Sequence, residues 1–236
     1  MAIIFIGKQQ EGKKEKVMLE KMNDFFDARV DGYEEHQMTT IDSAQEFYPY
    51  TASCLPDADG AKDVRILDLG CGTGLELGCY FKIVPTAHVT GIDLATGMLD
   101  ALRKKFPDKS LNLILGSYFD VPFGENEFDA AVSVESLHHF TKEEKIPLYK
   151  KVRVSLKSGG YFVLTDFFAL SDEEEKCCRA ELIRLRKEQN IQDGEFYHFD
   201  TPLTVEHEKE ALLAAGFSEV TVLKNWGVTY TLKAAV

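Results

Sequence analysis

The stretch Ile66-Leu67-Asp68-Leu69-Gly70-Cys71-Gly72-Thr73-Gly74 decides the fold of this chain. It is an apolar run that holds one acidic residue and ends in three glycines at alternate positions. Such a run is typical of a buried parallel strand, and the glycines let the backbone turn tightly and approach a ligand. Asp93 follows Gly74 by nineteen positions and closes a second apolar run, Val89-Thr90-Gly91-Ile92.

The spacing of the glycines indicates the kind of nucleotide that this turn accepts. A dinucleotide site favours Gly-x-Gly-x-x-Gly, with the third glycine inside the following helix, whereas here Leu75 occupies that position. At the end of the next strand, Asp93 can accept hydrogen bonds from both hydroxyls of a ribose, at roughly 1.5–3 kcal/mol for each charge-assisted bond. Asp68 is interpreted as an acceptor for the amides of the turn. We therefore expect a site for a single nucleoside.

Length and hydrophobic periodicity favour one α/β domain that covers residues 1–236. The chain has 236 residues, of which 44% are hydrophobic, and it can bury one sizeable core. Strands alternate with helices, which predicts a parallel sheet with helices on both faces. The expected core strands are 64–69, 88–93, 111–115, 128–134 and 160–166, and the expected helices are 74–84, 96–106, 142–156 and 204–215. Two final strands, Glu219–Trp226 and Val228–Ala234, are joined so closely around Gly227 that they should pair antiparallel.

Two segments lie outside this alternation. An amphipathic helix from Glu11 to about Val30, ended by Gly32, and a second helix over 40–55 form an expected helical cap within residues 1–58. In the 169–203 insertion, Ser171 and Glu174 read as a capping box that opens a helix to about Gln189, and an aromatic loop follows over 193–199. This insertion follows the carboxyl end of a strand, where open α/β sheets bind ligands, so we interpret it as a cover over the substrate side. A packing element over the sheet edge is the alternative.

Charge and cysteine content limit the classes of partner. The net charge is −12 and no block of five or six basic residues interrupts it, which disfavours a long phosphate backbone, although an acidic surface also serves solubility. Five cysteines without a C-x-x-C spacing indicate reduced thiols and no metal site. The apolar run 2–6 is too short for a signal peptide or a membrane span. We expect a cytoplasmic monomer or homodimer that binds neither nucleic acid nor membrane.

The pattern Asp-x-Gly-x-Gly-x-Gly over 68–74 resembles motif I of the class I S-adenosylmethionine (SAM)-dependent methyltransferases. The resemblance covers most of residues 25–236. It implies a Rossmann-like, mostly parallel seven-stranded sheet with an antiparallel last strand, SAM as the cofactor and S-adenosylhomocysteine (SAH) as the product. The cofactor-binding residues that it implies are Asp68, Gly70, Cys71, Gly72, Gly74, Asp93, Leu94, Ser117, Tyr118, Glu135 and Tyr33.

The segment after the third strand departs from the family at one position. Gly116-Ser117-Tyr118-Phe119 resembles a segment that usually begins Gly-Asp, so Ser117 replaces the aspartate that accepts the adenine amino group in the family. Tyr118 and Phe119 are candidates to stack on adenine, with a place in the core as the alternative. Asp120 could replace the missing acid if the loop turned it inward.

Two adjacent histidines follow the fourth strand. The sequence Leu137-His138-His139-Phe140 resembles the loop that reads His-His-Leu or His-His-Phe in many small-molecule methyltransferases. Imidazole titrates near neutral pH, so His138 and His139 are candidate general bases, and packing or loop ordering is the alternative. Methyl transfer needs little such help, because holding the nucleophile and the methyl group in line supplies most of the acceleration. The Asp/Asn-Pro-Pro-Tyr sequence of enzymes that methylate bases or protein amides is absent.

The segment Phe25–His36 resembles the N-terminal segment of small-molecule enzymes of this superfamily, where it folds over the cofactor. Tyr33 is therefore a candidate for the methionine end of SAM. Tyr48, His36 and, from the aromatic loop, His198 are candidate substrate residues. The alternative is an aromatic helix face that packs on the sheet.

These patterns lead to one functional expectation and two rivals. The expectation is SAM-dependent methyl transfer to a small molecule at O, N, S or C. A carboxy-SAM synthase is similar in the N-terminal segment and in Ala214–Phe217, but such enzymes hold the extra carboxylate with an arginine, and none occurs between Asp193 and Glu210. From another class, the protein could be a non-catalytic SAM-binding sensor or partner.

Overall fold

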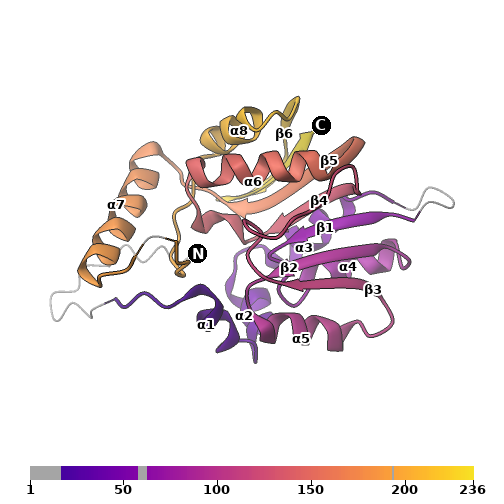
Figure 1. Cartoon of the computed structure of the whole chain (residues 1–236), viewed down its shortest axis with the longest axis horizontal. Helices are drawn as coiled ribbons and strands as arrows, with labels where there is room; N and C mark the ends of the chain where they lie inside the picture. The colour runs from indigo at the N-terminus through magenta and orange to yellow at the C-terminus, as the bar shows by residue number, and fades with distance from the viewer. Residues whose placement is uncertain (1–16, 58–62, 193) are drawn as a thin grey trace.

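The computed structural model describes residues 17–57, 63–192 and 194–236. Its strands form one seven-stranded sheet in the order β3-β2-β1-β4-β5-β7-β6 (Figure 1). The strands are β1 Arg65–Leu69, β2 His88–Asp93, β3 Ser110–Leu115, β4 Phe128–Val134, β5 Leu156–Phe167, β6 Glu219–Trp226 and β7 Thr229–Ala235. Every pairing is parallel except those that β7 makes with β5 and β6. The predicted mostly parallel sheet with an antiparallel last strand is confirmed.

The helices of the core also follow the predicted order. They are α4 Leu75–Ile83, α5 Thr96–Lys105, α6 Lys142–Ser155 and α8 Val205–Ala214, with α7 Asp172–Glu188 in the insertion. The hydroxyl of Ser171 accepts the amide of Glu174 at the start of α7, as the predicted cap requires. Within the described ranges, no helix combines the length and the apolar character needed to cross a membrane.

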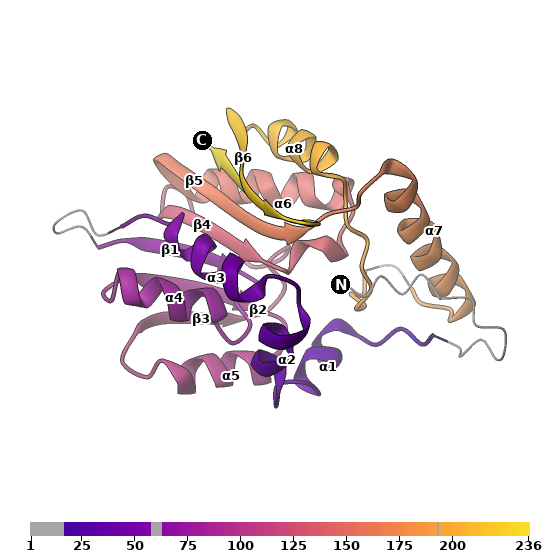
Figure 2. The same cartoon turned by 180° about the vertical axis from the view of Figure 1, so that it is seen from behind.

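Alternation along the strands separates the core into two layers. Leu67 and Leu69 pack in one hydrophobic cluster with α6 and α8, whereas Ile66 packs in the other with α4 and α5. Figure 2 shows α4 and the N-terminal helix α3 on one face of the sheet, with α6 and α8 on the far face. Both faces are therefore covered, as a parallel sheet requires.

The N-terminal region differs from the expectation. Residues 11–16 lie outside the described residues, and the predicted first helix is only the short α1, Met22–Asp27. Gly32 does not end that helix. It has a left-handed φ of 86° and immediately precedes a second helix, α2 (Tyr33–Thr40). Another left-handed residue, Ser43, separates α2 from α3, Ala44–Ser53. The predicted helix over 40–55 was wrong in its start, because these turns break a pattern that periodicity alone reads as continuous.

The order of the strands places a crevice at one edge of the sheet. From β1 the chain runs outward through β2 and β3, and then it returns to β4 on the other side of β1. At such a reversal the connections after neighbouring strands diverge, so the carboxyl ends of β1 and β4 border an open crevice. The glycine turn after β1 lies at this edge.

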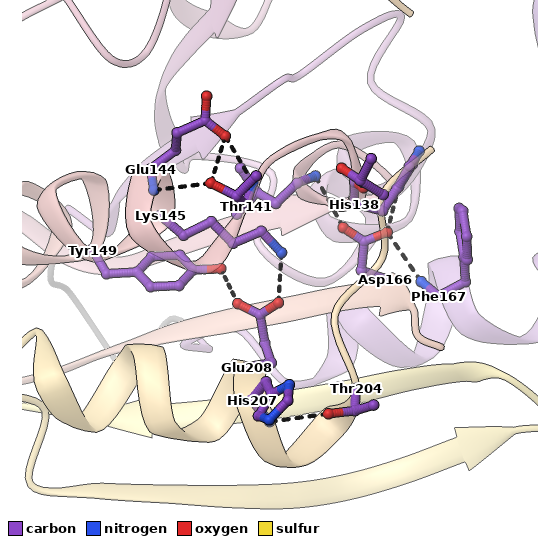
Figure 3. A network of polar contacts seen from close by, with 12 residues as sticks. His138, Thr141, Glu144, Lys145, Tyr149, Asp166, Phe167, Thr204, His207 and Glu208 are labelled. Carbon is purple, nitrogen blue, oxygen red and sulfur yellow. Dashed lines mark hydrogen bonds and ion pairs between the residues drawn. The ribbon is translucent and has the colours of Figure 1, made fainter. Parts of the chain in front are cut away.

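Helices α6 and α8 are joined by a buried polar triad (Figure 3). The Lys145 ammonium lies 2.5 Å from the carboxylate of Glu208, and the side chains are only 2% and 0% exposed. The hydroxyl of Tyr149 donates to the other oxygen of Glu208. Each charge is satisfied only by this arrangement, so the triad fixes how the two helices pack.

We predict that Lys145→Met lowers the free energy of unfolding by about 3–5 kcal/mol, because it leaves the Glu208 carboxylate buried without its cation. Lys142→Met is the matched control: Lys142 pairs with Glu210 between the same helices, but that carboxylate is 60% exposed, and its loss should change stability little. Urea denaturation of both variants measures the difference. Equal effects of the two substitutions would contradict the role given to the triad.

Candidate functional site

Two glycines of the turn after β1 serve different purposes. Gly70 and Gly72 both have left-handed backbone angles, with φ of 73° and 48°. A Cβ on Gly70 would lie 2.1 Å from the hydroxyl oxygen of Ser136, which follows β4. Apart from the glycine itself and its two chain neighbours, no atom of the described residues lies within 4 Å of a Cβ built on Gly72. Gly70 thus lets the exits of β1 and β4 pack together, and Gly72 leaves space beside the backbone for a ligand.

A carboxylate at the end of β2 holds this turn in place. One oxygen of Asp93 accepts the amide of Gly72 at 2.9 Å, and the other accepts the amide of Ala95 at 2.9 Å. The amide of Gly70 donates to the carbonyl of Ile92 at 2.9 Å. Burial raises the pKa of Asp93 above its usual value, although the amides of Ala95 and Gly72 oppose this. The carboxylate is fixed, and its remaining lone pairs can accept further hydrogen bonds.

Two residues that were predicted to bind the cofactor, Asp68 and Cys71, have side chains buried in the core. Asp68 is 1% exposed, and burial together with the hydrogen-bonded neighbour Glu76 raises the pKa of Asp68 well above its usual range. The turn amides described above bond to Asp93 and Ile92 instead, so the interpretation of Asp68 as their acceptor was wrong. Cys71 is also buried, and its sulfur would lie 2.8 Å from a Cβ on Gly91. Both side chains support the turn from inside the core.

A cavity of about 50 Å³ lies beside the turn. Its walls come from the carboxyl ends of β1, β2 and β4, from the loop after β3, and from the N-terminal helices. The lining residues are Met22, Phe26, Tyr33, Gly70, Gly72, Asp93, Leu94, Met98, Tyr118, Val134, Glu135, Ser136 and His139. Eight of these thirteen were predicted from the sequence, and Gly74, Ser117 and His138 were predicted but do not line it.

The segment after β3 divides its side chains between cavity and core. Tyr118 lines the cavity, and its hydroxyl donates to the Ser136 carbonyl at 3.3 Å. Phe119 instead packs among other aromatic side chains. The Ser117 hydroxyl accepts the amide of Phe119 at 3.1 Å, and Asp120 is exposed to solvent. Only Tyr118 of the predicted aromatic pair is therefore placed to contact a ligand, and Asp120 does not turn inward.

A second carboxylate organises the turn after β4. The 3-10 turn η1, Leu137–His139, follows Glu135, whose φ of 50° is left-handed. Near the end of β5, Asp166 accepts the amide of Leu137 at 2.9 Å (Figure 3). The other oxygen of Asp166 lies 2.6 Å from Nδ1 of His138. Asp166 thus fixes both the backbone of this turn and the orientation of one imidazole.

The two predicted bases belong to a larger cluster of buried titratable groups. Asp200 lies 3.5 Å from Nε2 of His138 and 3.3 Å from Nδ1 of His139. Burial lowers the pKa of His138, but the carboxylates of Asp166 and Asp200 outweigh this effect and raise it to about 9. Burial and the neighbouring His138 lower the pKa of His139. Burial and Asp166 raise the pKa of Glu135 to about 8. Charges on this side of the cavity are strongly coupled.

The N-terminal segment and the insertion meet next to the cavity. The amide of Met22 donates to the Phe196 carbonyl, and the amide of His198 donates to the Glu20 carbonyl, both at 3.0 Å. The His198 ring stacks on Phe25 with centroids 3.6 Å apart. Figure 1 shows α7, orange, standing apart from the helices that cover the sheet. The two segments predicted to cover the site are therefore hydrogen-bonded to one another.

The structure separates the predicted substrate residues. His198 lies beside the cluster, with its ring centroid 5.0 Å from that of His139. Tyr48 is buried on α3, and its hydroxyl lies 3.5 Å from the side-chain oxygen of Gln37. His36 is exposed on α2. Neither Tyr48 nor His36 lines the cavity. Left-handed turns at Gly32 and Ser43 break the N-terminal region into separate helices, so these two side chains do not lie on one continuous helix face.

Sequence reasoning missed the two aspartates that surround the histidines. Asp166 near the end of an apolar strand carries the same signal that identified Asp93, namely an acid at the carboxyl end of a parallel strand. Asp200 lies in a loop with no periodicity. Only the tertiary contact of that loop with η1 reveals it.

Comparison with known proteins gives a match over the strands that build the site. Residues 66–160 match the family model described as a methyltransferase domain. The biotin biosynthesis bifunctional protein BioHC of Teredinibacter turnerae is 29% identical over 82% of this chain and 32% of its own length. The tRNA (carboxymethyluridine(34)-5-O)-methyltransferase of Saccharomyces cerevisiae is 30% identical over 40% of this chain and 32% of its own length. The chain thus spans about a third of each of these relatives.

A solved structure extends the likeness to nearly the whole fold. A Nostoc punctiforme protein classed as an O-methyltransferase superposes with a TM-score of 0.67 and 18% identity, over 93% of this chain and 63% of its own. The family-model match, residues 66–160, spans β1 to β4 and the start of β5 and includes the glycine turn and Asp93, which border the crevice of the sheet. Residues 66–160 therefore match a methyltransferase domain, and the fold of the chain resembles that of the class I SAM-dependent methyltransferases.

Proposed function

We propose that this protein binds SAM beside Gly72 and Asp93 and transfers its methyl group to a small-molecule acceptor. One observation carries the proposal: the Asp93 carboxylate is fixed by two backbone amides at the edge of a cavity that reaches His139. A nucleoside held at one end of this cavity directs its tail toward the histidines. This arrangement supports a donor side and an acceptor side within one cavity.

The residues present fit SAM. Asp93 can accept the ribose hydroxyls, and in the described part of the chain no residue other than the two neighbours of Gly72 comes within 4 Å of a Cβ built on it. Leu94, Met98 and Tyr118 also line the cavity and can supply apolar contact for the base. The Oε1 atom of Glu135 is buried and has no hydrogen-bond partner in the described part of the chain, so it can accept from the ammonium of the methionine part.

Catalysis in this proposal rests on positioning. SAM supplies a methyl group that its sulfonium has already activated. The protein holds the acceptor atom in line with this methyl group. Such alignment can give effective molarities of about 10⁵–10⁸ M, which lowers the barrier by roughly 7–11 kcal/mol. Met22, Phe26 and Tyr33 form the wall on the N-terminal side and shield the reacting groups from water. For an acceptor that carries a proton, His139, which lines the cavity and has a lowered pKa, remains our candidate base. His138 is the weaker candidate, because a pKa of about 9 leaves its imidazole protonated at neutral pH.

A small-molecule acceptor is favoured over a nucleic acid. The net charge of −12 opposes a long phosphate backbone, although one relative is named for tRNA. All five cysteines are free thiols, which supports the proposed cytoplasmic location. A monomer or homodimer remains our proposal for the assembly. The carboxy-SAM synthase and the non-catalytic SAM-binding protein remain rivals to be separated by turnover.

Asp93→Ala should weaken SAH binding by about 2–4 kcal/mol, because two charge-assisted hydroxyl contacts are lost. Asp100→Ala, an exposed aspartate on α5, is the matched control and should bind normally. Calorimetry gives the affinities, and SAH release from SAM with a metabolite library measures turnover. An Asp93→Ala affinity within twofold of the wild type would remove the ribose role. Binding without release from any acceptor would favour the non-catalytic rival.

We further propose that residues 25–50 and 169–203 cover the site and open to admit ligand, since Phe26 and Tyr33 line the cavity and His198 of the insertion stacks on Phe25. SAH should protect both segments from hydrogen exchange, because a mobile cover is drawn from the less stable part of a fold. Strand β4 is the internal control and should be equally protected in both samples. Full protection of both segments without ligand would show that they are rigid packing elements.

A further inference from the structure

The acceptor side of the cavity has the donor set of a metal site. One ring nitrogen of His138, one of His139 and one carboxylate oxygen of Asp200 lie within 4.8 Å of one another. Both histidines are buried, and the Asp200 side chain is 31% exposed. His139 also lines the cavity, so the cluster adjoins the space in which we place the acceptor.

The spacing of these atoms matches that of tetrahedral coordination. With metal–ligand bonds of roughly 2.0–2.1 Å, the ligand atoms of a tetrahedral zinc site lie about 3.3–3.4 Å apart. The Asp200 oxygen lies 3.5 Å from Nε2 of His138 and 3.3 Å from Nδ1 of His139. N–H···O hydrogen bonds are about 2.7–3.2 Å long, and Nδ1 of His139 also lies 3.2 Å from the Phe199 carbonyl oxygen, so a metal ion would take the place of the proton on that nitrogen. The two distances from the Asp200 oxygen are therefore close to the edge length of a coordination tetrahedron, and the two ring nitrogens lie within 4.8 Å of one another.

The surroundings hold the ligands as a metal site requires. Nδ1 of His138 lies 2.6 Å from Asp166, which leaves Nε2 to face Asp200. Such a carboxylate–histidine pair fixes the tautomer and orientation of a ligating imidazole. Asp166 in turn accepts the amides of Leu137 and Phe167, so its own position is set by the backbone.

The charge of the cluster also favours a cation. Glu135, Asp166 and Asp200 place three carboxyl groups around two imidazoles, and among the described residues no lysine or arginine lines the cavity. Lys145, behind Asp166, is already paired with Glu208. A second group of potential ligand atoms, from Glu135, His138 and Asp166, lies within 4.8 Å next to the first. A divalent cation would balance this excess of acidic groups.

We propose that His138, His139 and Asp200 bind a divalent transition-metal ion, of which Zn²⁺ is the best match. Two imidazoles and one carboxylate are a ligand set that zinc uses in catalytic sites, where a fourth position stays open. Mg²⁺ and Ca²⁺ prefer oxygen ligands only and fit this set poorly. The open fourth coordination position would lie on the side of the cavity, which His139 lines.

The catalytic consequence rests on the proposed function, whereas the binding of the ion does not. An acceptor hydroxyl or thiol on the open position would lose its proton to solvent, because a bound divalent cation lowers its pKa. Methyl transfer then forms the new C–O or C–S bond and breaks the S–C bond of SAM, with SAH as the leaving group. The two histidines would act as ligands, and the ion would replace the general base predicted for them.

The test is titration of the full-length protein, freed of metal with a chelator, with Zn²⁺ by calorimetry and with Co²⁺ by visible absorption. We expect one ion per chain and the intense absorption of tetrahedral cobalt. His139→Ala and Asp200→Ala should each lower the Zn²⁺ affinity at least tenfold, and Asp166→Asn should lower it by about 10–100-fold through His138. His88→Ala is the matched control, because His88 also faces an aspartate, Asp63, at the opposite end of the sheet.

Circular dichroism and thermal unfolding show whether each variant is folded, and the wild-type titration does not depend on any variant. The proposal is overturned if the wild type binds no ion, if cobalt shows only octahedral absorption, or if His88→Ala weakens binding as much as His139→Ala. SAH binding by the same metal-free protein separates the two proposals. If the wild type binds no metal ion but the metal-free protein still binds SAH, only the metal-site proposal is contradicted.

Discussion

The fold and the site depend on one half-buried carboxylate that two backbone amides hold. Asp93 ends β2, and its oxygens accept the amides of Gly72 in the turn after β1 and of Ala95 in the turn after β2. The parallel register that sets Leu69 opposite Ile92 brings these turns together. Without the hydrogen bonds, neither the left-handed backbone at Gly72 nor the space beside it would be defined. The cofactor side of the cavity follows from this contact.

A second strand-end aspartate organises the opposite side. Asp166 of β5 binds the backbone and the imidazole of the turn after β4, as Asp93 of β2 binds the turn after β1. The two acids lie on opposite sides of the β1/β4 reversal. One fixes the turn that we propose holds the nucleoside, and the other fixes the orientation of His138 on the side where we propose the acceptor binds. The same physical device, a carboxylate at the end of a parallel strand that accepts turn amides, thus positions the donor and acceptor sides separately.

The sequence predicted the regular part of this arrangement well, because strand and helix periodicity reports burial directly. The strand His88–Asp93 was predicted with its observed bounds, and the glycine spacing led to Gly70, Gly72 and Asp93. Periodicity failed where single residues turn the chain. Gly32 and Ser43 break the N-terminal helices, so His36 faces solvent and Tyr48 enters the core.

Contacts between distant irregular segments were beyond sequence reasoning. The bonds that join residues 20–22 to residues 196–198 involve backbone groups, which leave no trace in the pattern of side chains. Asp200 reaches His138 and His139 across more than sixty positions of the chain through a loop of the insertion. The expectation of no metal site came from the missing C-x-x-C spacing, and that rule does not address ligands from separate loops.

The central claim is that the glycine turn and Asp93 form a site for one nucleoside with an amino-acid tail. Calorimetric titration of the same protein with SAM, SAH and NAD tests it most directly. We predict one site for SAM and for SAH and no measurable binding of NAD, because Leu75 replaces the glycine that a pyrophosphate site needs at the start of the helix. Binding of NAD as tight as that of SAH would contradict the account.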